Sequence, residues 1–163
     1  MTKENSLLVE LRSIAYAIGS EGRQGEFYQQ MLKDAKPIEV ARLSEVFSPT
    51  EIKVIKRFVN PKVKECYRNA TLFAHIFPDV KYVEGKMTCC GCFGIEHAWN
   101  KVGNKYVDIT MELVLERDPT QEEYLMLGEY DQQTVVDVAL EMNFYGSIYP
   151  ILYNKNRYEK AKR

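Results

Sequence analysis

Cys66, His97 and Asp108 occur in this order along the chain, and their side chains are the three parts of an activated cysteine nucleophile. An imidazole can take the proton of a thiol, and a carboxylate can hold that imidazole in one tautomer and stabilise its charged form. The thiolate then attacks a carbonyl carbon, and water or an amine releases the acyl group. The three residues therefore predict cysteine-dependent acyl transfer.

Cys66 is expected at the beginning of a helix. The apolar residues that follow it recur at helical spacing, which puts the thiol on the side that packs against a sheet: Ala70, Phe73, Ala74 and Phe77. A helix that began at Pro61 would bury the thiol one turn too deep, so we expect the chain to break near Lys64 and Glu65. The positive end of a helix beginning at about Cys66 would stabilise a thiolate.

His97 and Asp108 lie on two strands of a predicted β-hairpin. A Gly-Asn dipeptide between Val102 and Lys105 has the length and composition of a two-residue hairpin loop. Pairing Val102 with Lys105 makes His97 and Asp108 diagonal neighbours, within reach of a hydrogen bond. The register predicts two faces, with Ile95, His97, Trp99, Tyr106, Asp108 and Thr110 on one and Glu96, Ala98, Val107 and Ile109 on the other.

Asn60 is a candidate for stabilising the oxyanion, together with the backbone N–H of Cys66. Its side-chain amide could face the developing negative charge, but the same residue could cap the turn that begins at Pro61. Asn69 and His75 lie further along the predicted helix. We interpret Asn69 as a local brace and His75 as a residue that interacts with the helix dipole.

Aromatic residues supply the candidates for a substrate pocket. Tyr145 and Tyr149 lie in the aromatic run 144–150, while Tyr67 and Trp99 follow Cys66 and His97 closely in the sequence. Aromatic side chains with one polar end suit a ligand cleft. Packing of a closing segment onto the sheet explains the run equally well, so both interpretations stay open.

Three further cysteines, Cys89, Cys90 and Cys92, offer a rival chemistry. The Cys89-x-x-Cys92 spacing is that of half a tetrahedral zinc site, which His97 or Cys66 would have to complete because a second such pair is missing. A redox role is a further alternative, since neighbouring thiols in a loop exchange or oxidise. With no export signal in the sequence, all four cysteines are expected to be reduced.

Four short motifs resemble the core of the transglutaminase-like group within the papain-like cysteine peptidase superfamily, and also small phage and bacterial proteins with the same series. They are C-Y-x-N-A from Cys66, Y-V-E-G from Tyr82, H-A-W from His97 and V-D-x-T from Val107, and the similar region spans about Asn60 to Glu112. The resemblance implies that Cys66 is the nucleophile, His97 the general base and acid, and Asp108 the orienting residue.

The resemblance limits what can be said of the substrate. Many members carry Trp beside the nucleophilic Cys, whereas this chain has Tyr67, so details of a substrate pocket do not transfer. The group includes peptidases, amidases, cross-linking acyltransferases and inactive members. The similarity in fold therefore does not choose among these activities.

Composition excludes several classes of protein. The chain has 163 residues, enough for one domain with a core of its own, and its 22 Lys and Arg balance 23 Asp and Glu. Balanced charge argues against a nucleic-acid partner, and the basic C-terminal end, Lys155 to Arg163, is explained by a solvated helix end. Neither a membrane span nor a secretion signal is recognisable, so we expect a cytoplasmic location. No cofactor is implied, and oligomeric state cannot be predicted.

The chain is expected to form a single α+β domain, 1–163. It would consist of a helical N-terminal layer (1–59), a core made of the Cys helix and the β-hairpin (60–112), and a C-terminal helix or strand segment that closes the fold (113–163). Periodicity predicts five of the helices, over 7–18, around Phe27 to Leu32, over 40–47, after the Ser48 cap and over 133–142. Another helix is expected to start at Asp118, and a strand is expected over 80–87. The sheet is expected to be short and antiparallel, with Cys66 at its edge.

These observations favour thiol-dependent acyl transfer or hydrolysis of an amide, peptide or isopeptide bond, with a peptide or small acyl compound as substrate. Two alternatives remain. One is a binding protein that keeps the fold without catalysis and uses its aromatic C-terminal surface. The other is a small zinc protein that uses Cys89 and Cys92.

Overall fold

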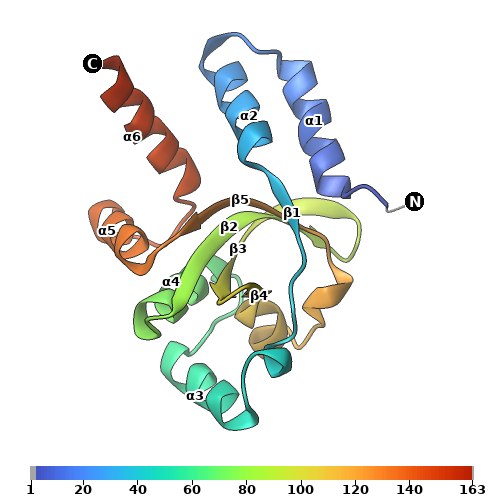
Figure 1. Ribbon diagram of the computed structural model, residues 1–163, viewed down its shortest axis with the longest axis vertical. Coiled ribbons are helices and arrows are strands. Elements are labelled where there is room, and N and C mark those ends of the chain that lie inside the picture. Colours follow the sequence, from blue (N-terminus) through green and yellow to red (C-terminus); the bar gives the residue numbers. More distant parts are fainter. Residues whose placement is uncertain (1–2, 163) are drawn as a thin grey trace.

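The computed structural model describes residues 3–162, which form an α+β fold as the sequence predicts (Figure 1). An antiparallel sheet has the strand order β1-β5-β2-β3-β4. Its strands are β1 (Lys36–Ile38), β2 (Val80–Cys89), β3 (Phe93–Val102), β4 (Lys105–Val107) and β5 (Tyr124–Tyr130). The helices are α1 (Ser6–Ile18), α2 (Gly22–Asp34), α3 (Pro49–Val59), α4 (Cys66–Ile76), α5 (Gln132–Met142) and α6 (Tyr149–Ala161).

The sheet curls because one chain segment joins its two edges. After β1, which pairs with β5, the chain crosses to β4, where Val40 forms a bridge with Tyr106 and the N–H of Ala41 donates to the carbonyl of Tyr106 at 2.8 Å. The inner face of the curled sheet is filled by a buried cluster: Val40, Val83, Met87, Trp99, Met111, Tyr124 and Met126. The predicted helix over 40–47 is therefore wrong, since only a short 3-10 turn, Leu43–Glu45, forms there.

Helices cover the outer face of the sheet in two groups. Helices α1 and α2 pack on β5 through Leu7, Leu11, Met31 and Leu125. Helices α3, α4 and α5 pack on β2 and β3 through a larger cluster that includes Ile55, Val59, Ala70, Phe73, Ala74, Tyr82, Ala98, Val135 and Val138. In Figure 1 the first group lies above the sheet together with α6, and α3 and α4 lie below it.

Local sequence signals explain where several helices begin and end. The Ser48 hydroxyl accepts from the N–H of Glu51 at 3.3 Å, and the Glu51 carboxylate accepts from the N–H of Ser48 at 2.7 Å, so the predicted capping box of α3 is confirmed. Gly19 ends α1 with a φ of 82°, a conformation that glycine adopts without strain. Only a 3-10 turn, Pro119–Gln121, follows Asp118.

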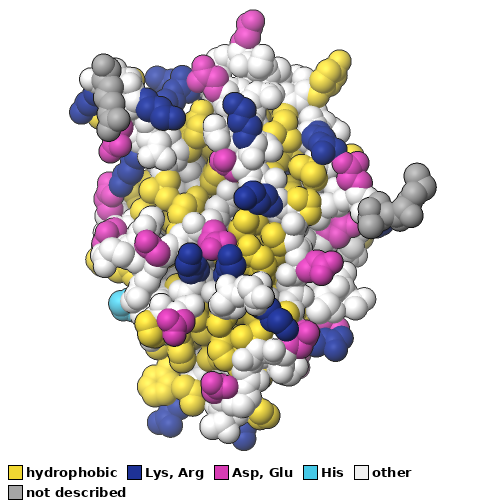
Figure 2. Space-filling model, in the orientation of Figure 1, with side chains coloured by type: hydrophobic (Ala, Val, Ile, Leu, Met, Phe, Trp, Pro, Cys, Tyr) yellow, Lys and Arg dark blue, Asp and Glu magenta, His cyan; other side chains and the backbone are white. Residues whose placement is uncertain are grey.

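The surface carries mixed charge. On the face shown in Figure 2, Lys and Arg side chains lie among Asp and Glu side chains, with apolar side chains exposed between them. Within residues 3–162 no helix combines the length and the apolar character that crossing a bilayer would require.

Glu84 is a buried carboxylate in the middle of β2 and is only 2% exposed. It accepts hydrogen bonds from the Tyr82 hydroxyl at 2.6 Å and from the Ser147 hydroxyl at 2.8 Å. The N–H groups of Ile148 and Tyr149 also donate to it, at 3.0 and 2.6 Å. Burial raises the pKa of Glu84, and these four donors oppose that effect. Glu84 thus fixes the chain that enters α6 to the outer face of the sheet.

Replacing Glu84 by Ala is expected to lower the free energy of unfolding by about 2–4 kcal/mol, because it leaves two backbone N–H groups without an acceptor. Chemical denaturation of the two proteins measures the difference. The matched control is Glu96→Gln. Glu96 is an exposed residue of β3 on the same face of the sheet as Glu84, and its replacement should lower the free energy of unfolding by less than about 0.5 kcal/mol. Equal stability of Glu84→Ala and the unsubstituted protein would contradict this account of the buried network.

Candidate active site

Cys66 is the first residue of α4, as the sequence predicts, and its thiol is half-buried. The chain turns sharply just before it, because Lys64 adopts a left-handed conformation with a φ of 61°. The Glu65 side chain does not cap the helix, and the first helical bond runs from the N–H of Asn69 to the carbonyl of Glu65 at 2.8 Å. The N–H groups of the first turn therefore have no intrahelical acceptor and surround the thiol with positive partial charge.

Asn69 holds the loop before Cys66 in place. Its buried side chain accepts from the N–H of Lys62 at 2.9 Å and donates to the carbonyl of Lys62 at 2.8 Å and to the Thr110 hydroxyl at 3.1 Å. The interpretation of Asn69 as a brace is confirmed. Because Thr110 follows Asp108 closely, the same side chain ties the Cys66 loop to the segment that carries the acid.

His97 and Asp108 are joined by a hydrogen bond of 2.7 Å between Nε2 and Oδ2. Both are buried, at 4% and 0% exposure. Two further donors fix the carboxylate: the Tyr124 hydroxyl reaches Oδ2 at 2.9 Å, and the N–H of Met111 reaches Oδ1 at 3.1 Å. Asp108 is thus an acceptor for three donors, which sets both its position and the tautomer of the imidazole.

The hairpin brings these residues together with the predicted register. Val102 pairs with Lys105, and Gly103 has the positive φ, 60°, that a two-residue loop requires. The strand ends at Val107, however, and a π-helical turn, Thr110–Val114, follows. The backbone carbonyl of Asp108 accepts a hydrogen bond from the N–H of Glu112 at 3.2 Å where this turn begins. The prediction that Thr110 continues the strand face is wrong, because the chain leaves the sheet after Asp108.

The Cys66 thiol lies close enough to the imidazole of His97 to raise its pKa. Since Nε2 is bonded to Asp108, Nδ1 is the ring nitrogen left for the sulfur. Strand β4 pairs with Asn100, Lys101 and Val102 of β3 and ends before it reaches His97. The edge of β3 is therefore uncovered at His97, and α4 packs against β3. The three side chains therefore meet at this edge.

The charge state of His97 follows from opposing effects. Burial disfavours the protonated imidazole, but the Asp108 charge and hydrogen bond, together with the contact to Cys66, raise the pKa of His97 from 6.5 to about 10. The imidazole is accordingly a cation at neutral pH, held between a carboxylate and a sulfur.

Asn60 is the exposed C-cap of α3 and has a left-handed backbone, with φ 46° and ψ 61°. Its carbonyl accepts from Nη1 of Arg68 at 3.1 Å. The expectation that Asn60 caps the turn beginning at Pro61 is wrong, since it ends the preceding helix instead. Its role toward an oxyanion stays a prediction.

The four aromatic candidates occupy different places. Trp99 is 1% exposed and stacks against the inner side of the His97 ring, with centroids 6.2 Å apart. Tyr149 is buried at 6% exposure and donates to Asp34 at 2.6 Å, which links α6 to α2. Tyr145 is 45% exposed on the loop before α6. Tyr67, the neighbour of Cys66 in α4, is half-buried.

A cavity of about 90 Å³ lies beside Tyr67, between α2, the start of α6 and the outer face of the sheet. Burial and the charges of Glu84 and Glu96 raise the pKa of Tyr67, and its hydroxyl contacts Ser147. Apolar and polar side chains line the cavity together. The apolar or aromatic ones are Phe27, Tyr28, Met31, Leu127, Tyr149 and Pro150, and the polar ones are Glu84, Lys86, Glu96 and Ser147.

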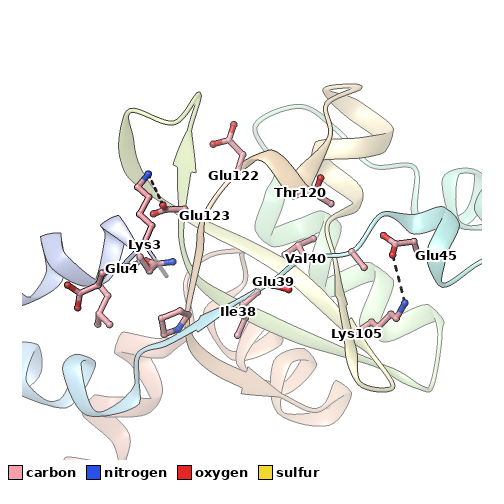
Figure 3. Close-up of a pocket in the computed structure, with 14 residues that line it drawn as sticks. Lys3, Glu4, Ile38, Glu39, Val40, Glu45, Lys105, Thr120, Glu122 and Glu123 are labelled. Atoms are coloured by element: carbon pink, nitrogen blue, oxygen red, sulfur yellow. Dashed lines mark hydrogen bonds and ion pairs between the residues drawn. The ribbon is translucent and has the colours of Figure 1, made fainter. Parts of the chain in front are cut away.

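A larger groove of about 1080 Å³ runs along β1 (Figure 3). Its rim carries the ion pairs Lys3–Glu123 at 3.6 Å and Lys105–Glu45 at 4.0 Å. Neither Cys nor His is among the described residues that line it. In residues 3–162 no three His, Cys, Asp or Glu side chains converge as a metal site requires, so Cys89 and Cys92 find no third ligand.

No sequence pattern assigns a role to Tyr124 or to Glu84, although Glu84 lies within the Y-V-E-G motif. Tyr124 approaches Asp108 from β5, a strand that the sequence does not predict, and Glu84 is the one acidic residue of β2. The arrangement as a whole pairs a half-buried thiol at a helix start with a buried imidazole and carboxylate. Comparisons with protein-family models, with curated proteins and with solved structures find no match to this chain.

Proposed function

We propose that this protein is a cysteine hydrolase or acyltransferase that acts on an amide, peptide or isopeptide bond. The observation that carries the proposal is the position of the His97 ring, which is bonded through Nε2 to Asp108 at 2.7 Å and contacts the Cys66 thiol on its other side. Such an arrangement is what an activated cysteine nucleophile requires.

Each residue has a defined task. Nδ1 of His97 already holds the proton drawn from Cys66, in keeping with the cationic ring, and the sulfur attacks the carbonyl carbon of the substrate. The Cys66 N–H, at the start of α4, donates to the oxyanion. His97 then gives its proton to the leaving amine, and a thioester forms on Cys66. Water or a second amine, deprotonated by His97, attacks the thioester and restores the thiol. Asp108 stabilises the imidazolium throughout.

The proposal includes a papain-like or transglutaminase-like core. A Cys at the start of a helix that packs on an antiparallel sheet, with His and Asp supplied by successive segments of that sheet, supports it. The order of the three residues along the chain agrees with the same group. Since no solved structure matches the chain, the proposed core is based on these features of the chain alone.

An activated ester tests the proposal. In a variant with Cys89, Cys90 and Cys92 changed to Ser, brief exposure to p-nitrophenyl acetate should leave one acetyl group on Cys66, detected by intact mass and peptide mapping. The acetyl group should then leave more quickly when a primary amine is added. Acetylation of lysines alone, with Cys66 unmodified, would contradict a nucleophilic Cys66.

A binding protein without catalysis is the second candidate, because an apolar surface is exposed near the C-terminal end. Leu140, Phe144 and Tyr145 are 74%, 53% and 45% exposed and border a groove of about 300 Å³ between α4 and α5. Exposed apolar patches of this kind mark interaction sites. An unreactive Cys66 in the acetylation experiment favours this candidate.

A further inference from the structure

The tip of the β2–β3 hairpin presents three thiols. Cys90 and Gly91 both have positive φ values, 56° and 68°, and the N–H of Cys92 donates to the carbonyl of Cys89 at 3.2 Å, which closes the turn. Cys90 and Cys92 are exposed, whereas Cys89 is half-buried. The tip is thus a tight turn with an accessible thiol on a left-handed residue at its apex.

A buried acidic side chain holds this turn in one place. Oε2 of Glu122 accepts from the Thr88 hydroxyl at 2.6 Å and from the N–H of Gly91 at 3.2 Å. Its Oε1 pairs with Arg117 at 2.9 Å, and the Glu122 side chain is only 3% exposed. The guanidinium of Arg117 is therefore anchored beside the turn by the same carboxylate that fixes the turn.

Arg117 and the thiols lie close together. The Cys90 sulfur is near enough to the Arg117 guanidinium and to the Cys89 thiol to raise the pKa of Arg117 and of Cys89. Burial is the larger cause of the raised pKa of Cys89. The Cys92 thiol instead points to the carbonyl oxygen of Cys90, at 3.4 Å. Cys90 alone combines exposure, a neighbouring cation and a second thiol within contact.

We propose that Cys90 is a site of reversible oxidation by hydrogen peroxide or another small hydroperoxide, with Cys89 as the resolving thiol. The Cys90 sulfur attacks one peroxide oxygen and the O–O bond breaks. The products are a sulfenic acid on Cys90 and one water from hydrogen peroxide, or one alcohol from another hydroperoxide. The Cys89 sulfur then attacks the Cys90 sulfur, and the hydroxyl leaves as water after taking the Cys89 proton. The two thiols are oxidised to a disulfide while the peroxide is reduced.

Arg117 favours the first step because its positive charge stabilises the negative charge on the attacking sulfur. The site is separate from Cys66, so it does not depend on the proposed acyl transfer. In a Cys66→Ala protein, hydrogen peroxide should remove two thiols together, and a peptide containing both Cys89 and Cys90 should lose two hydrogens and regain them with a dithiol reductant.

Substitutions separate the roles of the residues. Arg117→Gln should slow the loss of thiols by about tenfold, the effect of losing one charged hydrogen bond. Arg157→Gln, which removes an arginine of α6 that pairs with Glu26 of α2, should leave the rate unchanged. Cys89→Ser should stop the reaction at a sulfenic acid that dimedone traps on Cys90, and Cys92→Ser should leave the disulfide. Faster oxidation of Cys92 than of Cys90, or an unchanged rate in Arg117→Gln, would overturn the proposal.

Discussion

Replacing His97 by Ala is expected to slow the acetylation of Cys66 by p-nitrophenyl acetate at neutral pH by about 10²–10⁴-fold, the usual contribution of a positioned general base. The reason is that the imidazole lies beside the thiol and is the group that holds its proton. The rate is measured by intact-protein mass spectrometry in the Cys89, Cys90 and Cys92 to Ser background, so that Cys66 is the thiol that reacts.

The matched control is the other histidine. His75 lies exposed near the end of α4, where its ring nitrogen Nδ1 and its carbonyl are near Gln132, at 3.3 and 2.8 Å. His75→Ala should leave the rate within about twofold, as expected for a surface substitution away from the site. If His97→Ala and His75→Ala acetylate Cys66 equally fast, the imidazole of His97 has no part in the reaction.

Replacing Asp108 by Asn is expected to have the second large effect, a fall of about 10²–10⁴-fold in the same rate. All three groups around the carboxylate are donors, from His97, Tyr124 and Met111. An amide nitrogen facing His97 would donate to Nε2, which leaves a neutral ring with its one proton on Nδ1. Such a ring cannot also accept the proton of Cys66. Turned the other way, the amide would oppose the N–H of Met111 inside the protein, which costs stability.

Tyr124→Phe provides a graded comparison for Asp108→Asn. It removes one donor and keeps the carboxylate with its bonds to His97 and Met111. The loss of one hydrogen bond to a charged group corresponds to about tenfold in rate. Rates for Asp108→Asn that equal those of Tyr124→Phe would show that the charge of Asp108 is not what matters.

The parts of the site that the sequence predicts are those governed by local rules. The start of α4 follows from the spacing of Cys66 and the apolar residues behind it, and the contact of His97 with Asp108 follows from the length of one hairpin loop. In a hairpin the register is set by the loop, so a single dipeptide places residues on both strands.

The parts that the sequence does not predict depend on distant contacts. Strand β5, with the text YLMLGEY, contains good helix formers and lacks a clear alternation, and it becomes a strand because it pairs with both β1 and β2. Tyr124 on this strand is thus outside any local pattern. Val40 has helical spacing to Leu43, yet the bridge to Tyr106 across the curled sheet decides its conformation.

The strand that leads to Asp108 ends because the Asp108 side chain forms a hydrogen bond with the backbone that follows it. Its carboxylate accepts the N–H of Met111 at 3.1 Å, which starts a helical turn in place of another strand residue. An acidic residue that caps a turn is common, and the sequence V-D-I-T gives no sign that the strand stops there. The acid is therefore positioned by the turn as much as by the sheet.

The charge of the His97 ring is the most direct test of the unit formed by Cys66, His97 and Asp108. The chain has two histidines, so a His75→Gln variant gives the imidazole nitrogen signals of His97 alone in an NMR titration. We expect the signals of a protonated ring through neutral pH and a change only near pH 10, where the ring loses its proton. A ring that loses its proton near pH 6.5, as a free imidazole does, would contradict the coupling of the three side chains.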